Sequence, residues 1–155
     1  GNQPSSVLAQ DFSIFVYQGE DVLGTASLSL NQMLTLDKPL VLNFWAALCP
    51  PCRAEMQDLQ RVHDKFSDRI LLFGLDVGPF QLMGSREDAR ELLGELDITY
   101  PAGSTEDANV VRAYEIRGMP TTFFIKPTGN IHNKWTGLLN ESKMTELVEE
   151  LISAS

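Results

Sequence analysis

The sequence predicts an α/β fold in which a mixed β-sheet carries helices on both faces. Residues 40–45 form an almost continuous apolar run, which is typical of a strand buried on both faces, and a helical pattern follows directly from Cys49. Residues 70–75 give a second buried strand, which completes a β-α-β unit. Residues 121–125 and 131–135 flank a Pro-Thr-Gly-Asn turn and precede an amphipathic helix, which predicts a closing hairpin and helix.

The N-terminal part of the chain predicts an arm followed by a hairpin. Residues 1–10 are polar and have no period, so we expect a flexible arm there and a single domain over residues 11–155. Residues 12–17 alternate as a strand does, a turn follows at 18–21, and a second short strand is expected near 22–28. A helical turn is expected at 30–34.

Helices are predicted between the core strands and at the end of the chain. After Cys49, apolar residues recur every three or four positions up to Phe66, and two prolines fit the first turn. Ser85 with Asp88 three residues later forms a capping-box pattern that opens a helix inside an insertion at 77–105. A short helix is expected at 108–114. The closing helix has its apolar face at Met144, Leu147, Val148, Leu151 and Ile152.

Size and charge exclude several classes of function. A chain of 155 residues with 43% hydrophobic residues suits one soluble domain, and it contains no apolar run near the roughly 20 residues that span a bilayer. The formal net charge of -9 argues against nucleic acid and anionic membrane surfaces as partners. We expect a monomer, because no exposed apolar stripe is evident.

The two cysteines of the chain, Cys49 and Cys52, lie three residues apart. A bridge between them would close a very small loop and therefore stabilise the fold little. A zinc site needs four ligands, and the further soft ligands beyond the cysteines are only His63 and His132, which are expected on a helix and on a strand. A pair at the junction of a buried strand and a helix is instead the arrangement of a redox centre.

The helix N-terminus would supply the chemistry that such a pair needs. Its partial positive charge and free N–H groups stabilise a thiolate, which is the nucleophile. We expect Cys49 to be the more exposed sulfur and the attacking one, and Cys52, one turn inside, to be the resolving thiol. No cofactor is expected beyond the Cys49–Cys52 disulfide itself, and no metal.

Two segments carry a family resemblance. Residues 41–55, Val-Leu-Asn-Phe-Trp-Ala-Ala-Leu-Cys-Pro-Pro-Cys-Arg-Ala-Glu, resemble the active-site segment of the thioredoxin superfamily. Residues 118–125, Gly-Met-Pro-Thr-Thr-Phe-Phe-Ile, resemble its second motif, a loop whose proline is cis. The hairpin, Asn43 and the 77–105 insertion make the chain most similar to the TlpA/ResA-type branch, which is AhpC/TSA-related.

The resemblance implies a thioredoxin-like three-layer α/β/α fold with an N-terminal hairpin extension and a β-α insertion. It implies a cis Pro120 facing the cysteines, Met119 beside a substrate that pairs as an added strand, and Trp45 and Leu48 bordering the substrate. It implies a thiol–disulfide oxidoreductase that reduces a disulfide-bearing protein and is recharged by an upstream dithiol donor.

The branch also implies a compartment and a pathway. Its members are periplasmic or membrane-tethered, and several serve cytochrome c maturation. We therefore expect an extracytoplasmic location, with the signal or anchor outside the given sequence, although the residues alone leave a cytoplasmic one open.

Three departures from general thioredoxins bear on the proton acceptor, the substrate preference and the redox poise. Asn43 replaces a buried Asp and cannot take up a proton, so we hypothesise that Glu55, three residues after Cys52, accepts the Cys52 proton. Leu48 replaces a Trp, which affects substrate preference. Pro50 and Pro51 remove two N–H donors near Cys49, which predicts a less stabilised thiolate and a reducing poise.

Other functions stay open at this level. A peroxiredoxin needs a Thr three residues before the reactive cysteine, where this chain has Ala46. A non-catalytic binding module would use the Pro120 edge and leave the cysteines redundant. A thiol-dependent metal carrier would use the two sulfurs alone.

Overall fold

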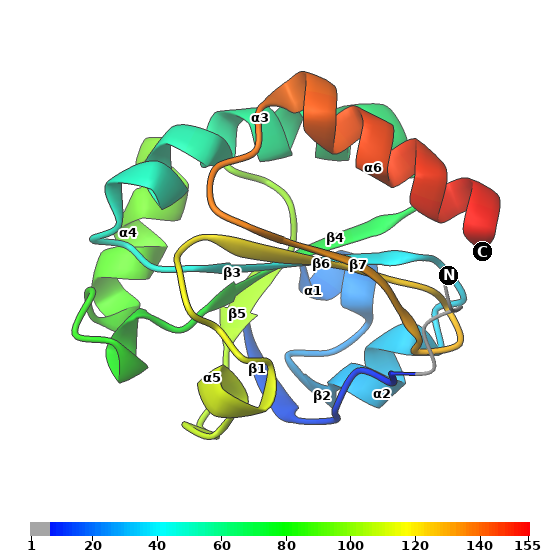
Figure 1. The fold of residues 1–155 in the computed structure, drawn as a ribbon. Coiled ribbons are helices and arrows are strands. Elements are labelled where there is room, and N and C mark those ends of the chain that lie inside the picture. Colours follow the sequence, from blue (N-terminus) through cyan, green and yellow to red (C-terminus); the bar gives the residue numbers. More distant parts are fainter. Residues whose placement is uncertain (1–6) are drawn as a thin grey trace.

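The computed structural model describes residues 7–155, and over that range the strands form one seven-stranded mixed sheet in the order β2-β1-β5-β4-β3-β6-β7 (Figure 1). The strands are β1 (Ser13–Gln18), β2 (Ser27–Ser29), β3 (Leu40–Trp45), β4 (Leu71–Asp76), β5 (Ala102–Ser104), β6 (Thr121–Ile125) and β7 (Ile131–Thr136). The helices are α1 (Glu20–Leu23), α2 (Leu30–Leu34), α3 (Pro50–Phe66), α4 (Arg86–Glu95), α5 (Val110–Ala113) and α6 (Glu141–Ala154), with a 3₁₀ turn at Gly78–Phe80.

The sheet separates two apolar cores, so the fold has three layers. Helices α3, α4 and α6 bury their apolar sides against one face, and α1, α2 and α5 bury theirs against the other. Figure 1 shows α3 and α6 above the sheet and α2 and α5 below it. Strands β3 and β4 are buried at every residue, as expected for strands covered on both faces. The predicted fold class is confirmed.

Two local elements differ from the prediction. Glu20–Leu23 forms a helical turn instead of part of a turn and strand, because Gly19 and Gly24 on either side adopt φ of 96° and 79°. The family resemblance implied a strand in the insertion, but the residue pattern did not locate it. The strand is β5, of sequence Ala-Gly-Ser, whose small residues give no apolar period. An ideal Cβ at Gly103 would lie 2.3 Å from the Phe15 carbonyl oxygen, so only glycine fits between β1 and β4.

The first described residues of the predicted arm contact the end of the sheet. The Ile131 N–H donates to the Val7 carbonyl (2.9 Å) and the Ala9 N–H donates to the Gly129 carbonyl (2.8 Å). Residues 7–9 are therefore held beside the start of β7. The rest of the predicted arm, residues 1–6, lies outside the described residues.

The topology brings three connecting segments to one end of the sheet. Strands β3 and β4 are parallel and end in register at Trp45 and Asp76, while β6 runs antiparallel to β3 and begins at that end. The segments after β3, after β4 and before β6 therefore meet, at the left of the view in Figure 1. The cysteines lie in the first of them.

Candidate active site

The two cysteines form a disulfide on the first turn of α3. Cys49 is the N-cap residue, Pro50 and Pro51 are the first helical residues, and the two cysteine Cα atoms are 5.2 Å apart. The Cys52 N–H donates to Cys49 Sγ (3.3 Å). The prolines between them have no N–H, so the Cys52 amide is the donor that the first turn supplies to this sulfur. The predicted position of the pair at a strand–helix junction is confirmed.

Both cysteines are buried. Cys49 is 2% exposed and Cys52 is 1% exposed, so in this disulfide form the two residues hardly differ in exposure, and the prediction that Cys49 is the more exposed sulfur stays a prediction. Cys49 packs in the same apolar core as Trp45 and Ala46. Leu48, by contrast, is 64% exposed and lies at the surface beside the pair, as expected for a residue that borders the substrate.

The second predicted motif precedes β6 at the same end of the sheet. The Met119–Pro120 peptide bond is cis, as predicted. Met119 is half-buried and packs against both cores, and Pro120 is buried. The Gly137 N–H donates to the Pro120 carbonyl (2.8 Å), which joins this loop to the segment between β7 and α6.

Glu55 is fully buried, so it is not a carboxylate on the solvated face of the helix. It lies on α3 three residues after Cys52, and each of its oxygens accepts one hydrogen bond. Asn43 Nδ2 donates to Oε1 (3.0 Å) and the Leu139 N–H donates to Oε2 (2.8 Å). Burial raises the pKa of Glu55 to about 7, although both hydrogen bonds favour the charged form. This carboxyl can therefore gain or lose a proton near neutral pH.

Asn43 explains how Glu55 can be accommodated. Its side-chain amide is 1% exposed and donates to Glu55 Oε1 and also to Thr122 Oγ1 (3.0 Å). An aspartate at position 43 would instead place a second carboxylate within hydrogen-bond distance of the first. Compared with general thioredoxins, which have a buried Asp at the position of Asn43 on β3, the buried carboxyl of this protein is Glu55 on α3. The Leu139 and Thr122 partners gave no signal in the sequence.

A second buried carboxyl lies at the end of β4 and was not predicted. Asp76 accepts hydrogen bonds from the Tyr17 hydroxyl (2.8 Å) and from the Gly78 N–H (2.9 Å). Burial raises its pKa to about 6, and the charge of Arg86 opposes the rise. An acidic residue ending the apolar strand Leu-Leu-Phe-Gly-Leu-Asp was the available signal.

Trp45 lies inside the core and not at the surface expected of a substrate contact. It is 1% exposed, and an ideal Cβ at Gly74 would lie 3.0 Å from its Nε1 atom and 3.2 Å from Tyr100 Cε1. Trp45, the last residue of β3, therefore packs in the same apolar core as both cysteines. Within the described part of the chain, the Trp45 Nε1 and Tyr100 hydroxyl atoms have no hydrogen-bond partner.

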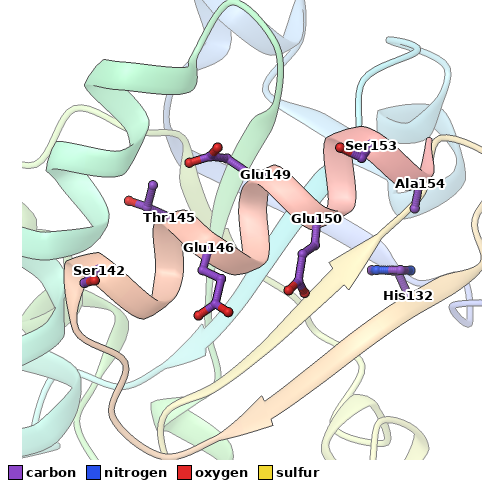
Figure 2. Close-up of a pocket in the computed structure, with 8 residues that line it drawn as sticks. All are labelled: His132, Ser142, Thr145, Glu146, Glu149, Glu150, Ser153 and Ala154. Carbon is purple, nitrogen blue, oxygen red and sulfur yellow. The ribbon is translucent and has the colours of Figure 1, made fainter.

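No group of three or more His, Cys, Asp or Glu side chains within residues 7–155 could hold a metal ion. A surface hollow of about 770 Å³ between α6 and β7 contains none of the residues above. Its lining consists of His132, Ser142, Thr145, Glu146, Glu149, Glu150, Ser153 and Ala154. Figure 2 shows Glu146 and Glu150 pointing toward the neighbouring strands. The lining of this hollow contains neither Cys49 nor Cys52.

Comparison with known proteins shows the family of this chain. Residues 8–134 match the AhpC/TSA family. The chain belongs to that family. Among its relatives, thiol-disulfide oxidoreductase ResA of Oceanobacillus iheyensis is 31% identical over 114 residues. Those residues are 74% of this chain and 57% of that protein, so the chain spans less than two thirds of this relative.

Solved structures show the fold of this AhpC/TSA member to be thioredoxin-like. A thiol:disulfide interchange protein of the thioredoxin family from Chlorobium tepidum matches with a TM-score of 0.76 at 23% identity, over 98% of this chain and 99% of that one. The exposed lipoprotein thioredoxin of Streptococcus pneumoniae strain TIGR4 matches with a TM-score of 0.73 at 19% identity, over 91% and 99%.

Proposed function

We propose that this protein is a thiol–disulfide oxidoreductase that reduces protein disulfides through a Cys49/Cys52 dithiol–disulfide cycle. The observation that carries the proposal is the disulfide on the first turn of α3, with the buried Glu55 carboxyl three residues beyond it on the same helix. The name of the Oceanobacillus iheyensis relative, a thiol-disulfide oxidoreductase, supports it.

The cycle starts from the dithiol form. The Cys49 thiolate attacks one sulfur of the substrate disulfide, a mixed disulfide forms, and the other substrate sulfur leaves as a thiolate. The Cys52 thiolate then attacks Cys49 Sγ, which releases the second substrate thiolate and closes the Cys49–Cys52 disulfide. Two electrons pass to the substrate, and an external dithiol returns them in the reverse sequence.

Glu55 is proposed to accept the proton of Cys52 before the second step. Its raised pKa, about 7, suits a group that must take and release a proton near neutral pH. Asn43 and the Leu139 amide hold its two oxygens in place, and Asn43 cannot compete for the proton because an amide does not titrate in this range.

The two prolines support a reducing poise. A strongly oxidising pair owes its potential to a stabilised thiolate, and the first turn of α3 offers Cys49 Sγ the Cys52 N–H but none from residues 50 and 51. Peroxide reduction is disfavoured, because buried Ala46 has no hydroxyl to offer at the position where peroxiredoxins need a Thr.

The proposal extends to the partners and the compartment. We propose a disulfide-bearing protein as substrate, a dithiol protein as electron donor, and a location outside the cytoplasm. The last is supported by the Streptococcus pneumoniae neighbour, which is an exposed lipoprotein. Among residues 7–155, no helix combines the length and apolar character needed to cross a membrane. A role in cytochrome c maturation, a monomeric state and independence from cofactors stay predictions.

A trapping experiment tests the proposed cycle. In the Cys52→Ser variant the second step is blocked, so a protein disulfide should accumulate as a mixed disulfide on Cys49, visible by mass and released by a thiol reductant. The Cys49→Ser variant is the matched control and should trap nothing. Equal trapping by both variants, or by neither, would contradict the assigned roles.

A further inference from the structure

Leu82 is an unusual residue at an unusual place. Its side chain is 99% exposed, and its φ of 54° lies in the left-handed region that glycine and asparagine adopt with least strain. A side chain other than these costs roughly 1 kcal/mol there. Neither burial nor backbone geometry accounts for a leucine at this position.

The loop that carries Leu82 has a defined structure. The Gly78 N–H donates to Asp76 Oδ1 (2.9 Å), and the Met83 N–H donates to the Gly78 carbonyl (3.0 Å). These bonds close residues 78–83 into a compact turn on the buried Asp76. Leu82 is therefore presented by an anchored loop.

The same loop is joined directly to the segment that carries the cysteines. The Leu48 N–H donates to the Met83 carbonyl (2.9 Å). An ideal Cβ at Gly84 would lie 3.1 Å from Ala47 Cβ and 3.2 Å from Leu48 Cγ, so the two backbones pack closely. Leu82, next to Met83, thus lies in the loop that touches Leu48, which is itself 64% exposed one residue before Cys49.

We propose that Leu82 is a docking contact for protein substrates, which receives an apolar side chain close to the substrate cysteine. In the sheet, β3 lies between β4 and β6, so the redox pair lies between the Leu82 loop and the Met119–Pro120 loop. Leu48 is exposed and directly precedes Cys49, so we expect a substrate whose sulfur reaches Cys49 to pass beside it, and the Leu82 loop contacts Leu48 through Met83.

The residues around Leu48 and Leu82 indicate which kind of substrate side chain would contact them. Residues 46–52 and residues 77–84 contain no charged side chain, although the whole chain has a formal net charge of -9. Two exposed leucines within these uncharged segments favour an apolar neighbour over a charged one, because contact removes apolar surface of both from water. The inference rests on the proposed function and adds the class of substrate: a polypeptide with an apolar residue near its cysteine.

The test compares Leu82→Asn with the unaltered protein, both in the dithiol form. Asparagine tolerates a positive φ, so the loop is retained, and Leu82→Gly provides a second variant that does the same. Three disulfides are offered: a peptide with leucines around its cysteine, the same peptide with serines, and oxidised glutathione. Leu36→Asn, at a 40%-exposed leucine at the opposite end of β3, is the matched control.

We expect the unaltered protein and Leu36→Asn to reduce the leucine peptide about fivefold to tenfold faster than the serine peptide. Both Leu82 variants should lose this preference, with the glutathione rate changed less than twofold. Retained preference in folded Leu82 variants would overturn the docking role while leaving the proposed function intact. An equal loss with all three disulfides would also overturn it. Failure of the unaltered protein to reduce any disulfide would overturn the proposed function and this inference together.

Discussion

Two buried carboxyls lie near the redox pair, and they differ in what surrounds them. Glu55 lies on the cysteine-bearing helix, and both of its donors are amide N–H groups, from Asn43 and Leu139. Asp76 lies at the end of β4, and its donors are the Tyr17 hydroxyl and the first amide of the Leu82 loop. Burial raises the pKa of both, to about 7 for Glu55 and about 6 for Asp76.

These surroundings suit Glu55 to the proton transfer that we propose and Asp76 to anchoring the loop after β4. At pH 7 Glu55 is close to half protonated and shares a helix with Cys52, so it can exchange a proton during the cycle. Asp76 is mostly ionised at that pH, and its hydrogen bonds tie β1 and the loop after β4 to one point. In the proposed cycle, a buried carboxyl therefore handles a proton at position 55, whereas the carboxyl at position 76 anchors a loop.

The largest expected effect follows from giving the Glu55 region a second carboxyl. In Asn43→Asp, two carboxylates would lie about 3 Å apart in the core, and like charges there cannot both ionise cheaply. We expect a loss of about 3 kcal/mol in the free energy of unfolding at pH 8, and a much smaller loss at pH 5. Urea unfolding at the two pH values measures it.

The control is the same substitution away from both carboxyls. Asn133→Asp on β7 should change the free energy of unfolding by no more than about 0.5 kcal/mol at either pH. An Asn43→Asp loss that is equal at pH 5 and pH 8 would show that Glu55 is not the interacting group.

Glu55→Gln should remove a pH dependence of stability. Because the folded-state pKa is raised from 4.5 to about 7, the folded state binds more protons in this window, and stability falls as pH rises through it. The fall is about 3 kcal/mol, and the difference between Glu55→Gln and the unaltered protein isolates it from Asp76 and His63. The resolving step at pH 7 should slow about tenfold or more.

Asp76→Asn is the matched variant at the other carboxyl. It should flatten stability only between about pH 4 and 6 and leave the pH profile of thiol exchange in place. If Asp76→Asn shifted that profile and Glu55→Gln did not, the assignment of the two groups would be reversed.

Tyr17→Phe should have a smaller effect, confined to the anchoring carboxyl. It removes the hydroxyl that donates to Asp76 over 2.8 Å, so we expect a loss of about 1.5 kcal/mol at pH 8, where Asp76 is ionised. At pH 4 the loss should be smaller, because the carboxyl is protonated. Thermal unfolding at both pH values measures it, and a pH-independent loss would count against the interaction.

The smallest effect is expected at an exposed carboxyl beside α3, the helix that carries Cys52. Glu95 forms an ion pair with Arg53, next to Cys52, and both side chains are at least half exposed. Glu95→Gln should change the free energy of unfolding by less than about 0.5 kcal/mol and leave exchange rates unaltered. A larger change would mean that burial is not what separates these carboxyls.

The sequence predicted most of the fold because its core strands and helices have strong periods. Each of these signals depends only on neighbouring residues. They are the apolar runs of β3, β4 and β6, the capping box at Ser85 and the prolines after Cys49. The position of strand β5 was missed because Ala-Gly-Ser has no apolar period. The sheet and its pairing were needed to place it.

The candidate site was predictable where the chemistry is local. Cys49, Cys52 and Glu55 lie within seven residues on one helix, so their spacing was informative. The partners that tune them come from distant segments: Leu139 is 84 residues from Glu55, and Tyr17 is 59 residues from Asp76. Burial of Cys49 likewise depends on the tertiary core and not on its position in the helix.

A redox titration tests whether Cys49 and Cys52 form a reducing redox pair. The protein would be equilibrated in graded thiol–disulfide buffers, its free thiols trapped by an alkylating agent, and the modified cysteines counted by mass. The account predicts one reversible two-electron transition of Cys49 and Cys52 below roughly -200 mV, in the range of reductants. A transition near about -120 mV would contradict the reducing poise, and no reversible transition would contradict the redox function itself.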